Sequence, residues 1–174
     1  MALNNSYNQE YTFVFPKLPK TVNELLSFKE ARLDTPFKTA ALAMLSLCVY
    51  KENKELCFEM LNALKGPAKL SPFEIQFLND RLKGKEYKPY SFFNGATKEN
   101  GYTPTMPLTI TVKQNPYSFP EENYATLFVH KDLNKIKLEP IEIYSDHMKY
   151  DGWSYSDNKD YKFPRYCYVI MLLK

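Results

Sequence analysis

The first half of the chain has hydrophobic residues at the spacing that is typical of helices. Three segments begin with a Ser or Thr suited to cap a helix, and two of these have proline next, which is favoured at the first helical position. Nearly every residue from Ala40 to Tyr50 is apolar, which predicts a helix buried on all sides. We therefore expect about four helices, which start near Thr21, near Thr35, after a polar break at 51–54, and near Ser71.

Beyond Gly84 the helical spacing ends, and proline, tyrosine and threonine become more frequent. Residues 108–112 alternate between apolar and polar, which predicts a strand with one buried face. Other strand patterns lie at 125–130, 136–144, 148–155 and 166–173, and we expect the last, as the most hydrophobic, to lie centrally in a sheet. Residues 11–15 could form a further short strand before Pro16.

This order of patterns predicts a single α+β domain over residues 1–174. In that fold an N-terminal helical layer of about four helices packs on a C-terminal, mostly antiparallel sheet of four to five strands. The expected parts are an N-terminal arm (1–20), a helical part (21–84), a long connecting loop (85–107) and a sheet part (108–174).

Composition and charge narrow the class of partner. Hydrophobic residues make up 44% of the chain, and the formal net charge is only +3. The residues up to Gly84 hold 11 Lys and Arg against 9 Asp and Glu, and the rest hold 12 against 11, so no basic stripe favours nucleic acid as a partner. The N-terminus lacks a signal-peptide pattern, and the longest apolar run is too short to cross a bilayer. We expect a cytoplasmic protein that does not bind membranes.

No residue pattern points to a metal, a cofactor or a catalytic centre. The three cysteines, Cys48, Cys57 and Cys167, include no C-x-x-C pair, and we interpret Cys48 and Cys57 as core thiols. The two histidines, His130 and His147, lie near no cysteine, and each is interpreted as a surface residue. Motifs of serine hydrolases, zinc proteases and calcium loops are missing. The sequence therefore predicts no cofactor and no metal, and names no catalytic residue.

The stretch FFNGATKENGYTP, residues 92–104, is the most unusual in the chain. Gly95 and Gly101 lack the spacing and the following lysine of a phosphate-binding loop, and their Asn-Gly dipeptides are typical of turns. The whole long connection from Gly84 to Met106, which contains this stretch, either wraps the core through its aromatic residues or forms a binding surface. The candidate binding residues are Asn94, Asn100 and Tyr102 in this loop, His130 at a strand end, and Trp153 in the aromatic-rich tail.

These observations leave the function unknown and support two hypotheses. The first is a non-enzymatic protein-interaction or regulatory module, because the chain is rich in tyrosine and lacks a catalytic constellation. The alternative is a small enzyme or small-molecule binder with a site between the 94–104 loop and the sheet. The sequence does not predict the oligomeric state or the identity of a partner.

Four stretches together resemble a known family. They are TPFKTAALAMLSLCVYKENKE, LKGPAKLSPFEIQFLNDRL, FFNGATKENGYTPTMPLTITV and NPYSF. In this order they are similar to an uncharacterised bacterial family, a domain of unknown function found mostly in Gram-positive gut bacteria such as clostridia. The resemblance covers roughly Thr21 to Tyr155, whereas the tail from Ser156 to Lys174 departs from it. It implies a bacterial, cytoplasmic origin, and it implies no activity, cofactor or catalytic residue.

Overall fold

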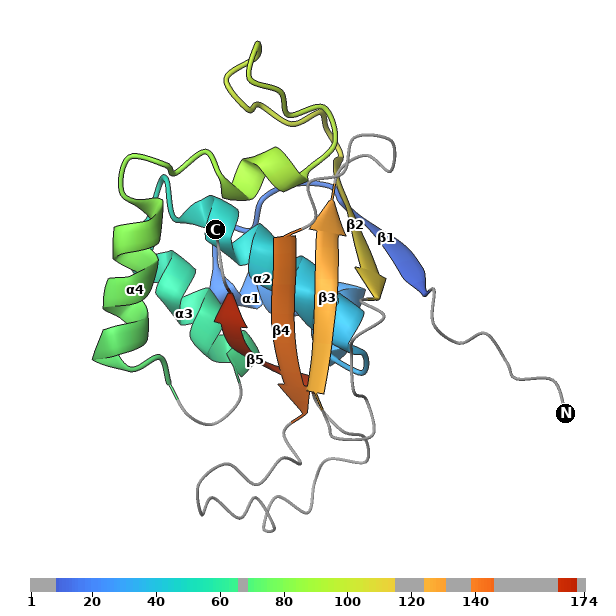
Figure 1. The fold of residues 1–174 in the computed structure, drawn as a ribbon, viewed down its shortest axis with the longest axis vertical. Coiled ribbons are helices and arrows are strands. Elements are labelled where there is room, and N and C mark those ends of the chain that lie inside the picture. Colours follow the sequence, from blue (N-terminus) through green and yellow to red (C-terminus); the bar gives the residue numbers. More distant parts are fainter. Residues whose placement is uncertain (1–8, 66–68, 115–123, 131–138, 146–165, 172–174) are drawn as a thin grey trace, which may run out of the picture.

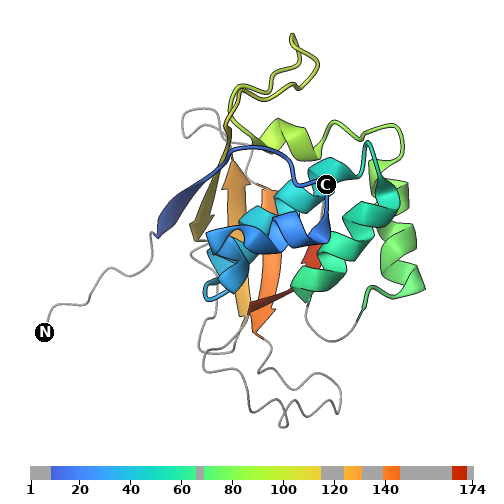
Figure 2. The same cartoon turned by 180° about the vertical axis from the view of Figure 1, so that it is seen from behind.

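The computed structural model describes residues 9–65, 69–114, 124–130, 139–145 and 166–171. Helices cover one face of an antiparallel sheet, as the two opposite views show (Figures 1 and 2). The α-helices are α1 (Val22–Ser27), α2 (Pro36–Val49), α3 (Lys54–Lys65) and α4 (Pro72–Leu82), and two 3-10 turns are η1 (Lys29–Arg32) and η2 (Pro89–Phe92). The predicted combination of a helical layer with an antiparallel sheet is confirmed.

The sheet has the strand order β1-β2-β3-β4-β5, and each strand pairs antiparallel with the next. The strands are β1 (Glu10–Phe15), β2 (Leu108–Gln114), β3 (Tyr124–His130), β4 (Glu139–Ser145) and β5 (Tyr166–Met171). Of the described strands, β5 pairs with β4 alone, so the expectation that the C-terminal strand lies centrally is wrong. The strand expected at 148–155 lies outside the described residues.

The N-terminal arm supplies one strand of this sheet. In β1, Phe13 and Phe15 lie opposite Ile110 and Leu108 of β2, and all four side chains are buried in the core. A strand exposes alternate residues on opposite faces, so β1 places these two aromatic residues against the helices. The sheet is therefore not confined to the part of the chain that follows the helices.

Helix α2 is the centre of the core. Thr35 caps it by accepting a hydrogen bond from the Lys38 amide at 3.3 Å, and Pro36 occupies its first turn. All residues from Thr39 to Val49 are buried, because α3 packs on one side of the helix and the sheet on the other. The helix predicted to be buried on all sides is confirmed. Over the residues given above, no helix combines the length and the apolar character needed to cross a membrane.

Candidate functional site

The connection between the helices and β2 consists of two unlike halves. The first half packs on the core through η2, where Phe93 is buried and Tyr90 and Phe92 are partly buried. The second half, Asn94–Thr105, extends past the end of the sheet (Figure 1, yellow-green) and is called the projecting loop below. The prediction that this connection wraps the core through its aromatic residues therefore applies only to its first half.

Backbone hydrogen bonds close the base of the projecting loop. The Asn94 amide donates to the Thr109 carbonyl at 2.9 Å, and the Thr105 amide donates to the Asn94 carbonyl at 2.9 Å. Gly95 follows with φ of +79°, and a Cβ at this position would lie 2.9 Å from the Thr105 backbone nitrogen. Only glycine fits both the conformation and the space. The side-chain oxygen of Asn94 is buried and has no hydrogen-bond partner among the described residues.

Asn100 organises the tip of the projecting loop. Its Oδ1 accepts hydrogen bonds from the amides of Thr97 and Thr103, at 2.9 and 3.1 Å. Its Nδ2 donates to the carbonyls of Gly95 and Thr103, at 2.7 and 3.0 Å. A carboxamide has two donor hydrogens and two acceptor lone pairs, so this side chain is fully used within the loop. The geometry therefore gives Asn100 a structural role.

Tyr102 joins the projecting loop to the segment before η2. Its φ is +60°, and its amide donates to the Thr97 carbonyl at 2.7 Å. Its ring stacks on the ring of Tyr87, with centroids 4.5 Å apart and planes 16° from parallel. One face of the Tyr102 ring is therefore covered by Tyr87.

The five candidate binding residues do not all fall in one described place. Asn94, Asn100 and Tyr102 share the projecting loop, as expected. The backbone of His130 ends β3 opposite Thr111, and the position of its side chain lies outside what the structure describes, as does Trp153. A binding role for the set stays a prediction.

The two described cysteines, Cys48 and Cys57, are buried core residues. Burial raises the pKa of the Cys48 thiol well above its ordinary value, with a further contribution from nearby Cys57. Burial also raises the pKa of Cys57 to about 12, so both thiols are protonated at neutral pH and are poor nucleophiles. No group of three or more His, Cys, Asp and Glu that could hold a metal ion occurs among the described residues.

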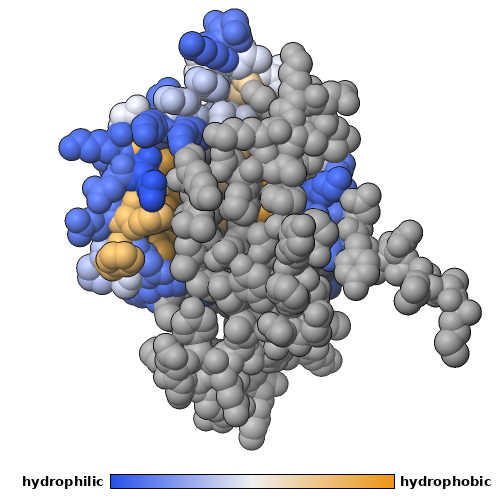
Figure 3. Space-filling model, viewed as in Figure 1, coloured by the Kyte–Doolittle hydropathy of each residue, from blue (hydrophilic) through white to orange (hydrophobic). Residues whose placement is uncertain are grey.

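Helix α4 carries apolar residues on two faces. The sequence groups its aromatic and aliphatic residues into one broad apolar face, but the structure divides them. Leu78 and Leu82 are buried in the core, whereas the Phe73 side chain is 77% exposed. Hydrophobic surface is visible over α4 in Figure 3. The apolar residues of α4 extend around more of the helix than the core covers. The part of the helix around Phe73 therefore faces outward.

The outward side of α4, called the α4 outer face, consists of Phe73, Gln76, Phe77, Asp80 and Arg81. Phe73, Phe77 and Arg81 follow one another at intervals of four residues, so they lie along one stripe of the helix. The Arg81 guanidinium lies over the Phe77 ring, 5.1 Å from its centroid. Phe73 and Arg81 are exposed, and Phe77 between them is partly buried. The two rings and the guanidinium form one stripe along the helix, which sequence reasoning missed.

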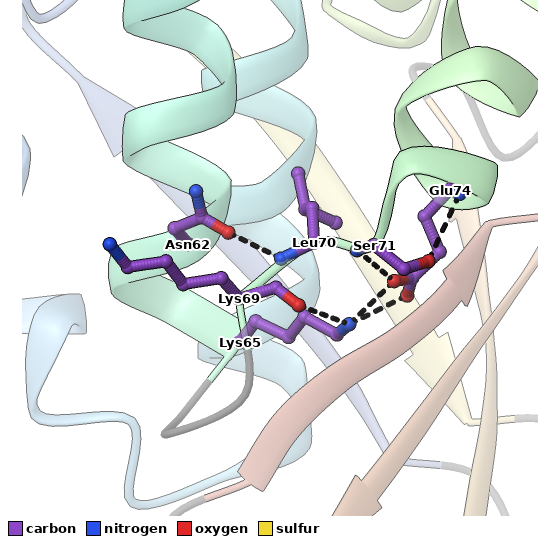
Figure 4. Close-up of polar contacts among 6 residues, drawn as sticks. All are labelled: Asn62, Lys65, Lys69, Leu70, Ser71 and Glu74. Atoms are coloured by element: carbon purple, nitrogen blue, oxygen red, sulfur yellow. Dashed lines mark hydrogen bonds and ion pairs between the residues drawn. The ribbon is translucent and has the colours of Figure 1, made fainter.

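The start of α4 is held by the polar cluster of Figure 4. Ser71 and Glu74 form a capping box, in which each side chain accepts a hydrogen bond from the amide of the other residue, at 2.7 and 3.3 Å. The Lys65 ammonium of α3 binds the Glu74 carboxylate at 2.7 Å. Asn62 accepts a hydrogen bond from the Leu70 amide at 2.7 Å. The backbone that carries Phe73 is therefore fixed against α3.

The Glu74 contacts predict an acid-dependent loss of stability. Burial raises the pKa of Glu74, but the hydrogen bonds from Lys65 and Ser71 outweigh it, so the net pKa lies below the ordinary 4.5. A lowered pKa in the folded state contributes stability above the ordinary pKa that is lost as the pH falls. In urea unfolding from about pH 6 to about pH 3, we expect the wild type to lose more stability than Glu74→Gln.

Glu59→Gln, which removes an exposed carboxylate on α3, is the control and should follow the wild type. Equal acid destabilisation in the wild type and Glu74→Gln would contradict the role given to the Lys65–Glu74 pair.

Comparison with known proteins identifies a family and no activity. A family model described as Domain of unknown function (DUF6935) matches residues 17–162. The match covers most of the chain, so the chain belongs to this family, and the resemblance inferred from its motifs is confirmed. Neither a curated protein nor a solved structure matches the chain.

Proposed function

We propose that this member of the DUF6935 family is a non-enzymatic protein-interaction module that binds its partner through the α4 outer face. The observation that carries the proposal is Phe73, a large aromatic side chain that is 77% exposed on a fixed backbone. Exposed apolar surface of this kind is unfavourable in water and is typical of sites that another molecule covers.

The composition and rigidity of the α4 outer face suit a protein contact. Aromatic residues and arginine are enriched at the centres of interfaces, where they contribute most of the binding free energy. The hydroxyl of Tyr50, directly after α2, donates to the Asn79 side chain at 2.6 Å and holds the second half of α4. The capping box holds its start. Because the helix is already ordered, binding loses little conformational entropy.

The charges around α4 indicate the character of the partner. Apart from Glu74, which is paired with Lys65, residues 69–86 carry more cations than carboxylates: Lys69, Arg81, Lys83 and Lys85 against Asp80 and Glu86. A complementary surface would have an apolar cleft for the two phenylalanine rings and acidic side chains at its rim. We therefore expect a protein partner with an apolar, acid-rimmed cleft.

Photo-crosslinking from the middle of this surface tests the proposal. The full chain is expressed in its native cell with the photoreactive residue p-benzoylphenylalanine in place of Gln76, or of Lys98 in the projecting loop as control. We expect a covalent adduct with one defined protein from position 76, loss of that adduct in Phe73→Ala, and no such adduct from position 98. Adducts that form from 98 and not from 76 would overturn the proposal.

The alternative function is a small-molecule site at the projecting loop. It is supported by a single observation, the environment of one side-chain oxygen. Asn94 Oδ1 at the base of the loop is buried without a hydrogen-bond partner among the described residues, so a ligand with a donor could pair with it. Two observations weigh against such a site. The Asn100 amide is used within the loop, and the loop extends away from the sheet (Figure 1).

A further inference from the structure

Strand β1 forms one end of the strand order, so only one of its two edges is paired with a described strand. The Gln114 amide donates to the Gln9 carbonyl at 2.8 Å, which fixes the pattern of the ladder that follows. Hydrogen-bonded positions alternate along an antiparallel pair, so the backbone groups of Tyr11, Phe13 and Phe15 face β2. Those of Thr12 and Val14 therefore face away from the sheet, and they have no hydrogen-bond partner among the described residues.

Beyond the charged Glu10 at its start, β1 lacks the features by which proteins protect edge strands from pairing. Natural edges are interrupted by lysine, proline or a bulge. The sequence EYTFVF contains none of these residues, and its register with β2 runs from Glu10 to Phe15 without a shift. Val14 is 51% exposed and Tyr11 is 46% exposed. Both residue types favour strands, so they suit pairing with a further strand. The edge combines open backbone groups with exposed apolar side chains.

We propose that the β1 edge pairs with the β1 edge of a second copy of this chain, so that two sheets join into one across a two-fold axis. An axis at Phe13 places Thr12 opposite Val14 of the partner subunit, and Val14 opposite the partner subunit's Thr12. The two outward-facing residues of each copy then exchange four backbone hydrogen bonds. Every bond uses a group that the monomer leaves open on this edge.

The side chains fit the same arrangement. Antiparallel pairing across this axis places Tyr11 opposite Phe15 of the partner subunit and diagonal to the partner's Phe13. The Tyr11 ring already contacts the Phe37 ring of α2, with centroids 4.7 Å apart, so the join extends an aromatic cluster that exists in each copy. The small net charge of +3 gives little repulsion between copies. A self-complementary edge favours a second copy over an unrelated strand because both halves of the contact are then satisfied by the same residues.

Sedimentation velocity of the full chain across the micromolar range tests this pairing. We expect a monomer–dimer equilibrium in the wild type, and a dissociation constant raised tenfold or more in Thr12→Pro, which removes an outward-facing amide hydrogen. Val14→Lys, which adds a charge at an exposed position, should act in the same direction and does not depend on tolerance of proline. Leu26→Lys, a matched charge change at a 44% exposed position on α1, should leave the equilibrium unchanged.

A wild-type chain that stays monomeric throughout overturns the proposal, and so does a dimer that Thr12→Pro and Val14→Lys leave intact while both remain folded. A monomer that instead captures an extended peptide would assign the edge to a strand from another protein. The outcome is independent of the α4 proposal, because Val14→Lys leaves the α4 outer face unchanged and Phe73→Ala leaves the β1 edge unchanged.

Discussion

Replacing Leu45 with alanine is expected to lower the free energy of unfolding by about 2–5 kcal/mol. Leu45 lies in the middle of α2 and is fully buried. The substitution removes apolar contacts and leaves a cavity that the close-packed surroundings cannot fill. Because α2 contacts both α3 and the sheet, the loss should appear as one cooperative shift of the whole unfolding transition.

Urea unfolding at neutral pH measures this effect, with Leu26→Ala as the matched control. Leu26 is the same residue type in a helix, but it is 44% exposed, so its truncation should cost less than about 1 kcal/mol. Equal losses in the two variants would contradict the placement of α2 at the centre of the core.

Replacing Gly95 with alanine is expected to lower the free energy of unfolding by about 2–3 kcal/mol. The residue has φ of +79°, a conformation that disfavours any Cβ by about 1–2 kcal/mol. The added methyl group also meets the side chain and backbone of Thr105, which close the base of the projecting loop. Relieving that overlap requires the Thr105–Asn94 hydrogen bond to shift.

Gly101→Ala separates the two contributions. Gly101 has φ of +63°, but a Cβ there meets no atom within 4 Å, so only the conformational penalty of about 1–2 kcal/mol applies. Thermal unfolding of both variants gives the comparison. If Gly101→Ala proved as destabilising as Gly95→Ala, close packing at the base of the loop would be ruled out as the reason for the glycine.

Local patterns in the sequence predict the helical part well. The caps at Thr21, Thr35 and Ser71 each accept the expected amide hydrogen bond, because a cap depends only on residues within one turn. Residues 21–24, TVNE, also have the sequence pattern of a capping box, but its reciprocal bond, from the Thr21 amide to Glu24, does not form. Glu24 accepts from the Lys20 amide at 2.7 Å and binds Lys17 instead, because a flexible exposed carboxylate has several donors within reach.

Features that depend on distant parts of the chain were not predictable. The short strand predicted at residues 11–15 is confirmed as β1, but its place in the sheet is decided by pairing with β2, about a hundred residues later, and was not predicted. In α4 the helical period places Phe73 and Leu78 in one apolar group, but only the packed core decides which of them is covered.

The projecting loop was predictable in part. The Asn-Gly dipeptides correctly indicate turns, since Gly95 and Gly101 both have positive φ. The sequence does not reveal that the Asn100 amide is used entirely within the loop. A residue taken as a candidate for binding therefore supports the loop, and our proposal places the contact surface on α4 instead.

The two proposed contact surfaces would act together. In both overall views α4 and β1 lie at opposite sides of the molecule (Figures 1 and 2). A dimer formed through β1 would leave both α4 outer faces open and would present two binding sites to a partner. Such a pair binds a partner with repeated sites more tightly than either site alone.

The most direct test of an interaction module centred on α4 is isothermal titration calorimetry. The titration uses the purified, free form of the protein that the crosslinking experiment identifies. The full chain is titrated as wild type, as Phe73→Ala and as Leu26→Ala, the last removing an exposed leucine from α1. We expect Phe73→Ala to weaken binding by about tenfold or more, the loss typical of an aromatic residue at the centre of an interface, and Leu26→Ala to bind like the wild type. Wild-type affinity in Phe73→Ala would contradict the account.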